Sequence, residues 1–263
     1  MIKFFRKIRQ NLLSKGETSQ YLKYAIGEIV LVVIGILIAL SINNWNEERK
    51  NSTREQVILK QLKEDYQANL IQLEQKIEMR NNIINSGIKI FKAIDYPEKV
   101  NRDSLIRLIG NINQDPTFDP VQNDLTSSGN LRLIKNEKLK RKLSNWSSDI
   151  VALTELEEAW SNIVNQHMEY EIAKLGISRD VVNSWINDSD QLWLLDKNQK
   201  ITETNFENSK HSVSVIEITS CKELEGIVAS AISFNKPANI QSLTLVKRIN
   251  EIIELIDSEI KEK

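Results

Sequence analysis

One acidic residue lies inside the most apolar stretch of the chain. Residues 25–42 read AIGEIVLVVIGILIALSI, and Glu28 is the single ionisable side chain among them. An acid within a membrane usually faces a partner or a water path, so proton or ion coupling is the chemistry that such a position suits. Glu28 also lies about one turn inside Tyr24, and its carboxylate can extend to the lipid headgroups towards Lys23. Both interpretations stay open from the sequence.

Three further residues carry side chains that could take part in chemistry. His167 and Glu171 lie one helical turn apart and could share a proton or an ion, although such pairs are commonly only solvated or hydrogen-bonded. Cys221 is the one cysteine of the chain; it precedes a predicted helix, where a thiol pKa can be lowered, but no base accompanies it. The two histidines belong to no metal-ligand motif, and the chain holds no nucleophile-elbow or phosphate-loop motif. We therefore expect no enzyme activity, no catalytic or metal-binding residue and no cofactor.

A third group of polar side chains is concentrated between residues 115 and 136. Asp119 followed by Pro120 is typical of a helix start, and Gly129 of a left-handed helix end, which predicts a two-turn helix between them. The same residues could line a polar site, but capping and turn chemistry explains each of them, and we favour that structural interpretation. The polar set comprises Asp119, Asn123, Asp124, Ser127, Ser128, Asn130 and Arg132.

The apolar stretch predicts a transmembrane helix over residues 25–45. Eighteen residues at ~1.5 Å per residue extend about 27 Å, close to the ~30 Å of bilayer hydrocarbon. Gly35 and Ala39 form a small-xxx-small pair and Gly27 lies near the same face, so a second helix could approach there. Small residues are also common in membrane helices generally. Tyr24 and Trp45 bracket the stretch as interfacial aromatic residues.

Residues 1–24 form a basic arm. Phenylalanines and other apolar residues share one arc of a helical projection and cations share the opposite arc, as in a helix that lies among lipid headgroups. We expect the arm to bind membrane lipid; the alternative is the basic region of a signal peptide, with processing near residues 39–41. The predicted interface residues are Lys3, Phe4, Phe5, Arg6, Lys7, Arg9, Tyr24 and Trp45.

The charge distribution bears on partners and orientation. Residues 1–24 have a net charge of +5 within a chain of net charge −1, so the remainder sums to −6 and is unlike a nucleic-acid-binding domain. Basic residues number six in residues 1–24 and five in residues 43–63, so the positive-inside count is nearly balanced. A basic amphipathic arm suits the anionic cytoplasmic leaflet. We expect a single-pass protein of the cell inner membrane with a cytoplasmic N-terminus and a periplasmic C-terminal domain.

Residues 46–263 are predicted to form that extracytoplasmic domain as a helical bundle. Glycine and proline number only 8 and 4, and apolar residues recur at helical spacing. We expect long helices over residues 47–94 and 136–175, a short helix over residues 103–112, and a helix on each side of Pro237, the first beginning with a Ser220–Glu223 capping box. SVSVIEIT, residues 212–219, predicts a short strand or extended segment. The predicted fold is mostly α, with a single N-terminal transmembrane helix followed by this bundle of long helices.

The run GEIxLVVxGILIALxxNNWNE at residues 27–47, together with MIKFFRKIRQ at the start and SSGNLRLIKN at residues 127–136, resembles an uncharacterised family of single-pass membrane proteins from Bacteroidota. The similarity is strongest over residues 1–50 and 117–136. The resemblance implies a membrane anchor and a mostly helical body. It implies no activity, substrate, cofactor or catalytic residue.

Together these features predict a membrane-anchored structural or interaction protein of the inner membrane, with a protein partner or a second copy of itself. Two alternatives remain. The domain could be an extracytoplasmic ligand sensor that acts through a partner, because only the short arm would face the cytoplasm. The protein could also be an ion-coupled accessory subunit that uses Glu28.

Overall fold

A computed structural model describes residues 18–121, 129–186, 204, 206–211 and 213–261. Every regular element among these residues is a helix, and none is a strand, which confirms the mostly α prediction. Contacts divide the chain into two compact units, residues 1–57 and 58–263.

The longest element is α2, Thr18–Asp95, a helix of 78 residues. It contains the apolar stretch and then extends through the region predicted as a long helix over residues 47–94, so helical periodicity in the sequence identified it correctly. Tyr96 and Pro97 follow directly, and the chain leaves the helix there in a short 3₁₀ turn at Pro97–Lys99. Proline accounts for the stop because it disfavours helical conformation in the residue before it.

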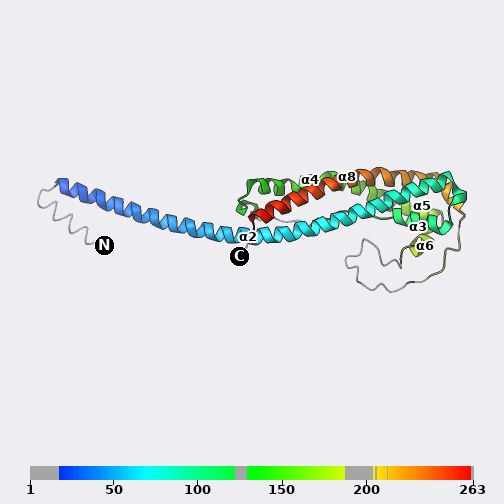
Figure 1. Cartoon of the computed structure of the whole chain (residues 1–263), viewed down its shortest axis with the longest axis horizontal. Helices are drawn as coiled ribbons and strands as arrows, with labels where there is room; N and C mark the ends of the chain where they lie inside the picture. The colour runs from blue at the N-terminus through cyan, green and yellow to red at the C-terminus, as the bar shows by residue number, and fades with distance from the viewer. Residues whose placement is uncertain (1–17, 122–128, 187–203, 205, 212, 262–263) are drawn as a thin grey trace. The chain divides into compact units, whose positions relative to one another are not determined.

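The unit of residues 58–263 is a bundle in which α4 and α8 run beside each other and beside the second part of α2 (Figure 1). The buried apolar residues fall into two clusters along this bundle, one around Trp160 and Ile109 and one around Leu59 and Ile249. The remaining elements of the unit are α3 Arg102–Ile112, a 3₁₀ turn Asn130–Leu133, α4 Glu137–Ile163, a π-helical turn Val164–Met168, α5 Glu169–Lys174, α6 Ser178–Asn183, α7 Val215–Thr219 and α8 Lys222–Glu259.

Several predicted helix ends are confirmed. The Asn136 side chain accepts a hydrogen bond from the Leu139 amide at 3.0 Å and so begins α4. The predicted single helix from Asn136 to Leu175 is present with a π-helical turn inside it. Gly176 ends it with φ of 70°, and Gly129 has φ of 71°, both in the left-handed region that glycine adopts readily. The predicted helix between Asp119 and Gly129 lies largely outside the described residues.

Three local predictions were wrong. Residues 215–219 form helix α7 rather than a strand, because Ser214 and Glu217 make a reciprocal capping box that begins a helix there. The N-cap of α8 is Cys221, so Ser220 with Glu223 is not the capping pair. Pro237 does not separate two helices, since α8 continues through it.

The continuity of α8 has a physical cause in its packing. Val228 and Ala231 before Pro237, and Ala238 and Leu245 after it, are all buried on the same bundle. Proline removes one backbone hydrogen bond and strains the preceding turn. The apolar side chains on both sides lose solvent exposure only if the helix axis is kept, and this burial outweighs the local cost.

Candidate functional site

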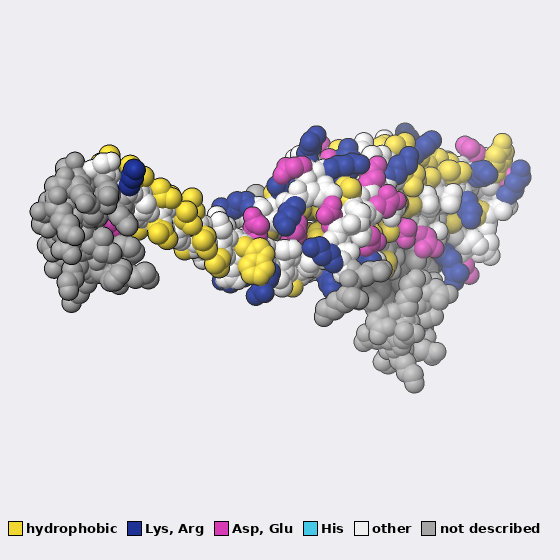
Figure 2. Space-filling model, turned by 60° about the vertical axis from the view of Figure 1, so that its left-hand side comes forward, with side chains coloured by type: hydrophobic (Ala, Val, Ile, Leu, Met, Phe, Trp, Pro, Cys, Tyr) yellow, Lys and Arg dark blue, Asp and Glu magenta, His cyan; other side chains and the backbone are white. Residues whose placement is uncertain are grey.

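The apolar part of α2 leaves its large side chains exposed (Figure 2). Leu31 is 65% exposed and Leu37 is 57% exposed, and none of the most apolar window is buried within the chain. Transfer of one such side chain from water to an apolar environment is favourable by about 1.5–3 kcal/mol. Among the described residues, this is the one helix long and apolar enough to cross a membrane, and it fits a single-pass anchor.

The small residues predicted to permit helix packing lie on an open surface. A Cβ atom added at Gly27 or Gly35 would meet nothing within 4 Å. Ala39 is likewise exposed. This part of α2 therefore offers a face on which another helix could approach the backbone closely. Glu28 is half-buried at the beginning of the apolar stretch.

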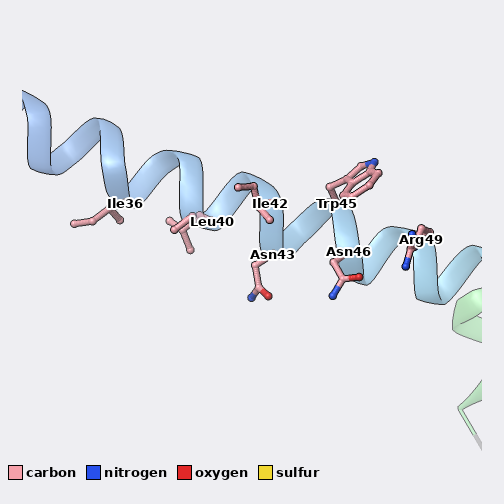
Figure 3. A pocket seen from close by; sticks show the side chains of 8 residues that line it. Ile36, Leu40, Ile42, Asn43, Trp45, Asn46 and Arg49 are labelled. Carbon is pink, nitrogen blue, oxygen red and sulfur yellow. The ribbon is translucent and has the colours of Figure 1, made fainter.

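The polar end of the apolar stretch begins at Asn43 (Figure 3). Ile36, Leu40 and Asn43 project from one side of α2, whereas Trp45 projects from the other, and these residues line an open pocket. Trp45 is 63% exposed, and the Arg49 guanidinium lies 5.7 Å from its ring centroid. An exposed tryptophan beside an arginine is the combination expected where a membrane helix meets the headgroups.

The remaining predicted interface residues are not placed. The Tyr24 backbone belongs to α2, but its side chain lies outside the described part of the molecule. The same holds for the whole of Lys3, Phe4, Phe5, Arg6, Lys7 and Arg9.

Inside the bundle, two charged residues that the sequence analysis did not single out form a buried ion pair. Arg80 of α2 is 0% exposed and pairs with Glu157 of α4, which is 4% exposed. The Arg80 guanidinium also donates to Ser242 Oγ of α8 at 2.8 Å and to the Pro116 carbonyl oxygen at 3.0 Å. One side chain thereby connects the three long helices and the segment between α3 and α4.

That segment, residues 114–121, is called the strap here because its backbone is held by side chains of α2 and α4. The Phe118 amide donates to the second Glu157 oxygen at 3.1 Å. The amides of Asp119 and Val121 donate to side-chain oxygens of Gln72, at 3.1 Å, and Asn69, at 2.7 Å. Extended backbone has no helical partners of its own, so these side chains supply acceptors for its amides, including that of the buried Phe118.

The electrostatics of the pair are dominated by burial. Burial raises the pKa of Glu157 to about 7, and the charge of Arg80 and the Phe118 amide oppose that rise. Burial lowers the pKa of Arg80, against the opposing effect of Glu157. Burial also lowers the pKa of Lys76, one turn before Arg80 on α2. Neither charged group of the pair reaches solvent, and the pair holds the strap through the Pro116 carbonyl oxygen and the Phe118 amide.

The other residues with reactive or ionisable groups, His167, Glu171 and Cys221, do not all lie together. His167 is exposed on the π-helical turn, while Glu171 is buried and pairs with Lys174 at 3.3 Å. The ligand atoms of Glu171, Cys221 and Glu223 lie within 4.8 Å of one another, and Cys221 Sγ donates to Glu223 at 3.6 Å. Lys174 supplies a positive charge beside these carboxylates. The pKa of Glu223 is lowered chiefly by a hydrogen bond from its own backbone amide and next by the charge of Lys174.

These observations define the class: a mostly helical protein with an apolar helix that fits a single-pass membrane anchor. A model of a family of unknown function, DUF6090, matches residues 28–159, and the chain belongs to this family. The matched region begins at Glu28 and includes Arg80, the strap and Glu157. Comparison with curated proteins and with solved structures finds no match.

Proposed function

We propose that this protein is a membrane-anchored interaction protein without catalytic activity, whose α2 helix crosses the inner membrane once and holds the helical domain in the periplasm. The exposed apolar surface of residues 25–42 is the observation that carries the proposal. A surface of that length and composition is stable in lipid and costly in water. The Trp45–Arg49 contact supports a headgroup position for the end of the span.

The interaction part of the proposal rests on the open small-residue face. Gly27, Gly35 and Ala39 leave space against the α2 backbone, where a membrane helix of a partner or of a second copy can pack. Substitution of Gly35 by leucine fills that space and should reduce detergent-resistant association at least several-fold. Val33→Leu, about 200° around the helix from Gly35, is the matched control.

Cross-linking in native membranes followed by purification in mild detergent measures this association. The proposal is supported if a stoichiometric partner or a homo-oligomer is recovered with the wild type. Gly35→Leu should weaken this association, and Val33→Leu should leave it intact. A monomeric, partner-free wild-type protein would contradict it.

The topology is tested independently. A reporter that is active only in the periplasm should be active when fused to the C-terminus, and a reporter active only in the cytoplasm should be silent. The opposite pattern would overturn the periplasmic location while leaving the membrane anchor intact.

A ligand-sensing role is the second candidate, and the unbroken course of α2 favours it. One helix contains both the apolar stretch and Arg80, which contacts the strap, α4 and α8. A ligand that moves the strap would act on that helix directly, and a partner that contacts α2 would relay the change. A ligand-dependent change in cross-linking between cysteines introduced on neighbouring α2 helices would distinguish sensing from static anchoring.

A further inference from the structure

A groove between α4 and α8 gathers positive charge. Its volume is ≈ 520 Å³, and Ile252, which is 1% exposed, lies in its lining. The α4 residues lie at positions 138, 141, 142, 145 and 149, a spacing that places them on one side of the helix. The polar lining residues are Lys138, Arg141, Lys142, Asn145, Asp149 and Arg248.

Two of the four cations are fixed by carboxylates. Arg248 pairs with Asp149 across the groove, and Lys142 pairs with Glu251 of α8. Lys138 and Arg141, by contrast, have no hydrogen-bond or ion-pair partner among the described residues. Four cations thus stand against two carboxylates, and the two unpaired cations lie on the α4 side.

Glu251, which pairs with Lys142 beside the groove, is affected by the positive charge of the groove. The pKa of Glu251 is lowered by its hydrogen bond to Lys142 and by the charge of Lys142, with smaller effects of Lys138 and Arg248. An anion placed in the groove would meet the same cations. Residues 25–263 have a net charge of −6, so this positive site differs in sign from the segment as a whole.

We propose that the α4–α8 groove binds a phosphate-bearing anion through Lys138 and Arg141, a role independent of the membrane anchor. A phosphate monoester carries about −1.5 to −2 charges at pH 7, whereas a carboxylate carries one. The groove holds two cations, Lys138 and Arg141, that have no hydrogen-bond or ion-pair partner among the described residues, so a doubly charged group balances them. The Arg141 guanidinium supplies a planar donor pair that matches phosphate oxygens, and Asn145 supplies an uncharged donor.

The test is titration calorimetry of the full chain in nonionic detergent with inorganic pyrophosphate at low ionic strength. The double variant Lys138→Gln, Arg141→Gln should bind at least 10-fold more weakly than the wild type. The control variant Lys89→Gln, Arg107→Gln removes the same charge from two other exposed positions and should leave the affinity within about 2-fold. Circular dichroism checks that all three proteins have the same helix content.

Mixed micelles that contain phosphatidylglycerol distinguish the source of the phosphate. Competition between these micelles and pyrophosphate for the groove identifies a lipid headgroup, and its absence identifies a soluble phosphate compound. The proposal would be overturned if the wild type did not bind pyrophosphate or if the two double variants lost affinity equally. It would also be overturned if a polyglutamate peptide of matched charge bound as tightly as pyrophosphate.

Discussion

At the scale of single residues, the buried Arg80–Glu157 pair is the clearest constraint on this protein. Both groups are removed from water, and each has more than one hydrogen-bonding partner. Removing one partner of such a pair leaves an uncompensated buried charge, whereas removing both can cost little. The pair therefore governs how strap, α2, α4 and α8 fit together more than it adds net stability.

We expect Arg80→Met alone and Glu157→Met alone each to lower the free energy of unfolding by about 3–5 kcal/mol. The double variant should lose less than the sum of the two, because no unpaired charge remains. Urea denaturation of the full chain in detergent, followed by circular dichroism, measures the free energy of unfolding of the wild type, the two single variants and the double variant. Additive losses would show that the two side chains act independently.

The raised pKa of Glu157 also predicts a pH dependence. Because this carboxyl has an ordinary pKa near 4.5 and a folded pKa of about 7, the folded state binds more protons than the unfolded state between these values. Stability from this group should therefore fall as pH rises from 4.5 to 7, by at most about 1.4 kcal/mol per pH unit. Lys76, Arg80 and Asp115 are the other charged groups that act on it.

The measurement is the slope of the unfolding free energy against pH over that interval. Glu157→Gln should flatten the slope, irrespective of its own destabilising effect, while the exposed neighbour Glu158 provides the control Glu158→Gln. An unchanged slope in Glu157→Gln would assign the dependence to other groups.

At the scale of elements, Gly176 follows the end of α5, and both its backbone conformation and its surroundings disfavour a side chain. Gly176 has φ of 70°, and a Cβ there would lie 3.1 Å from the His211 carbonyl oxygen. Gly226, in contrast, lies in the interior of α8 with open space around it. The same substitution should have opposite effects at these two positions.

We expect Gly176→Ala to destabilise the protein by about 1–2 kcal/mol, because a left-handed conformation is strained for alanine. Gly226→Ala should stabilise it by about 0.5–1 kcal/mol through helix propensity. Thermal unfolding compares both variants with the wild type. A stabilising Gly176→Ala would mean that the end of α5 adopts another conformation in solution.

The helices were largely predictable from local signals, and the residues that connect them were not. The apolar spacing of α2 and the cap at Asn136 are properties of neighbouring residues, so the sequence contains them directly. The predicted helix break at Pro237 was wrong because the local cost of proline is outweighed by contacts with residues far away in sequence. Arg80 and Glu157 form a contact across 77 residues, which periodicity cannot reveal.

A signal for the buried pair was nevertheless present. Glu157 follows Leu153 by four residues and precedes Trp160 by three, so it occupies a core position of α4. Arg80 likewise follows the apolar positions Leu73 and Ile77 of α2. Core spacing therefore indicates that each charge has a buried partner, because neither can be buried alone, but it does not identify which two residues pair.

At the scale of the whole molecule, the apolar surface of residues 25–42 determines where the protein can exist. Lys at the centre of a membrane helix costs about 2.5–3.5 kcal/mol on insertion scales, so two cost about 5–7 kcal/mol. We expect Ile34→Lys with Leu37→Lys to move most of the protein from the carbonate-resistant membrane pellet into soluble or aggregated fractions. Val57→Lys with Val151→Lys adds the same charge at exposed positions outside the stretch and should leave the protein in the pellet. If the Ile34, Leu37 variant stayed in the pellet as the wild type does, the stretch would not be the anchor.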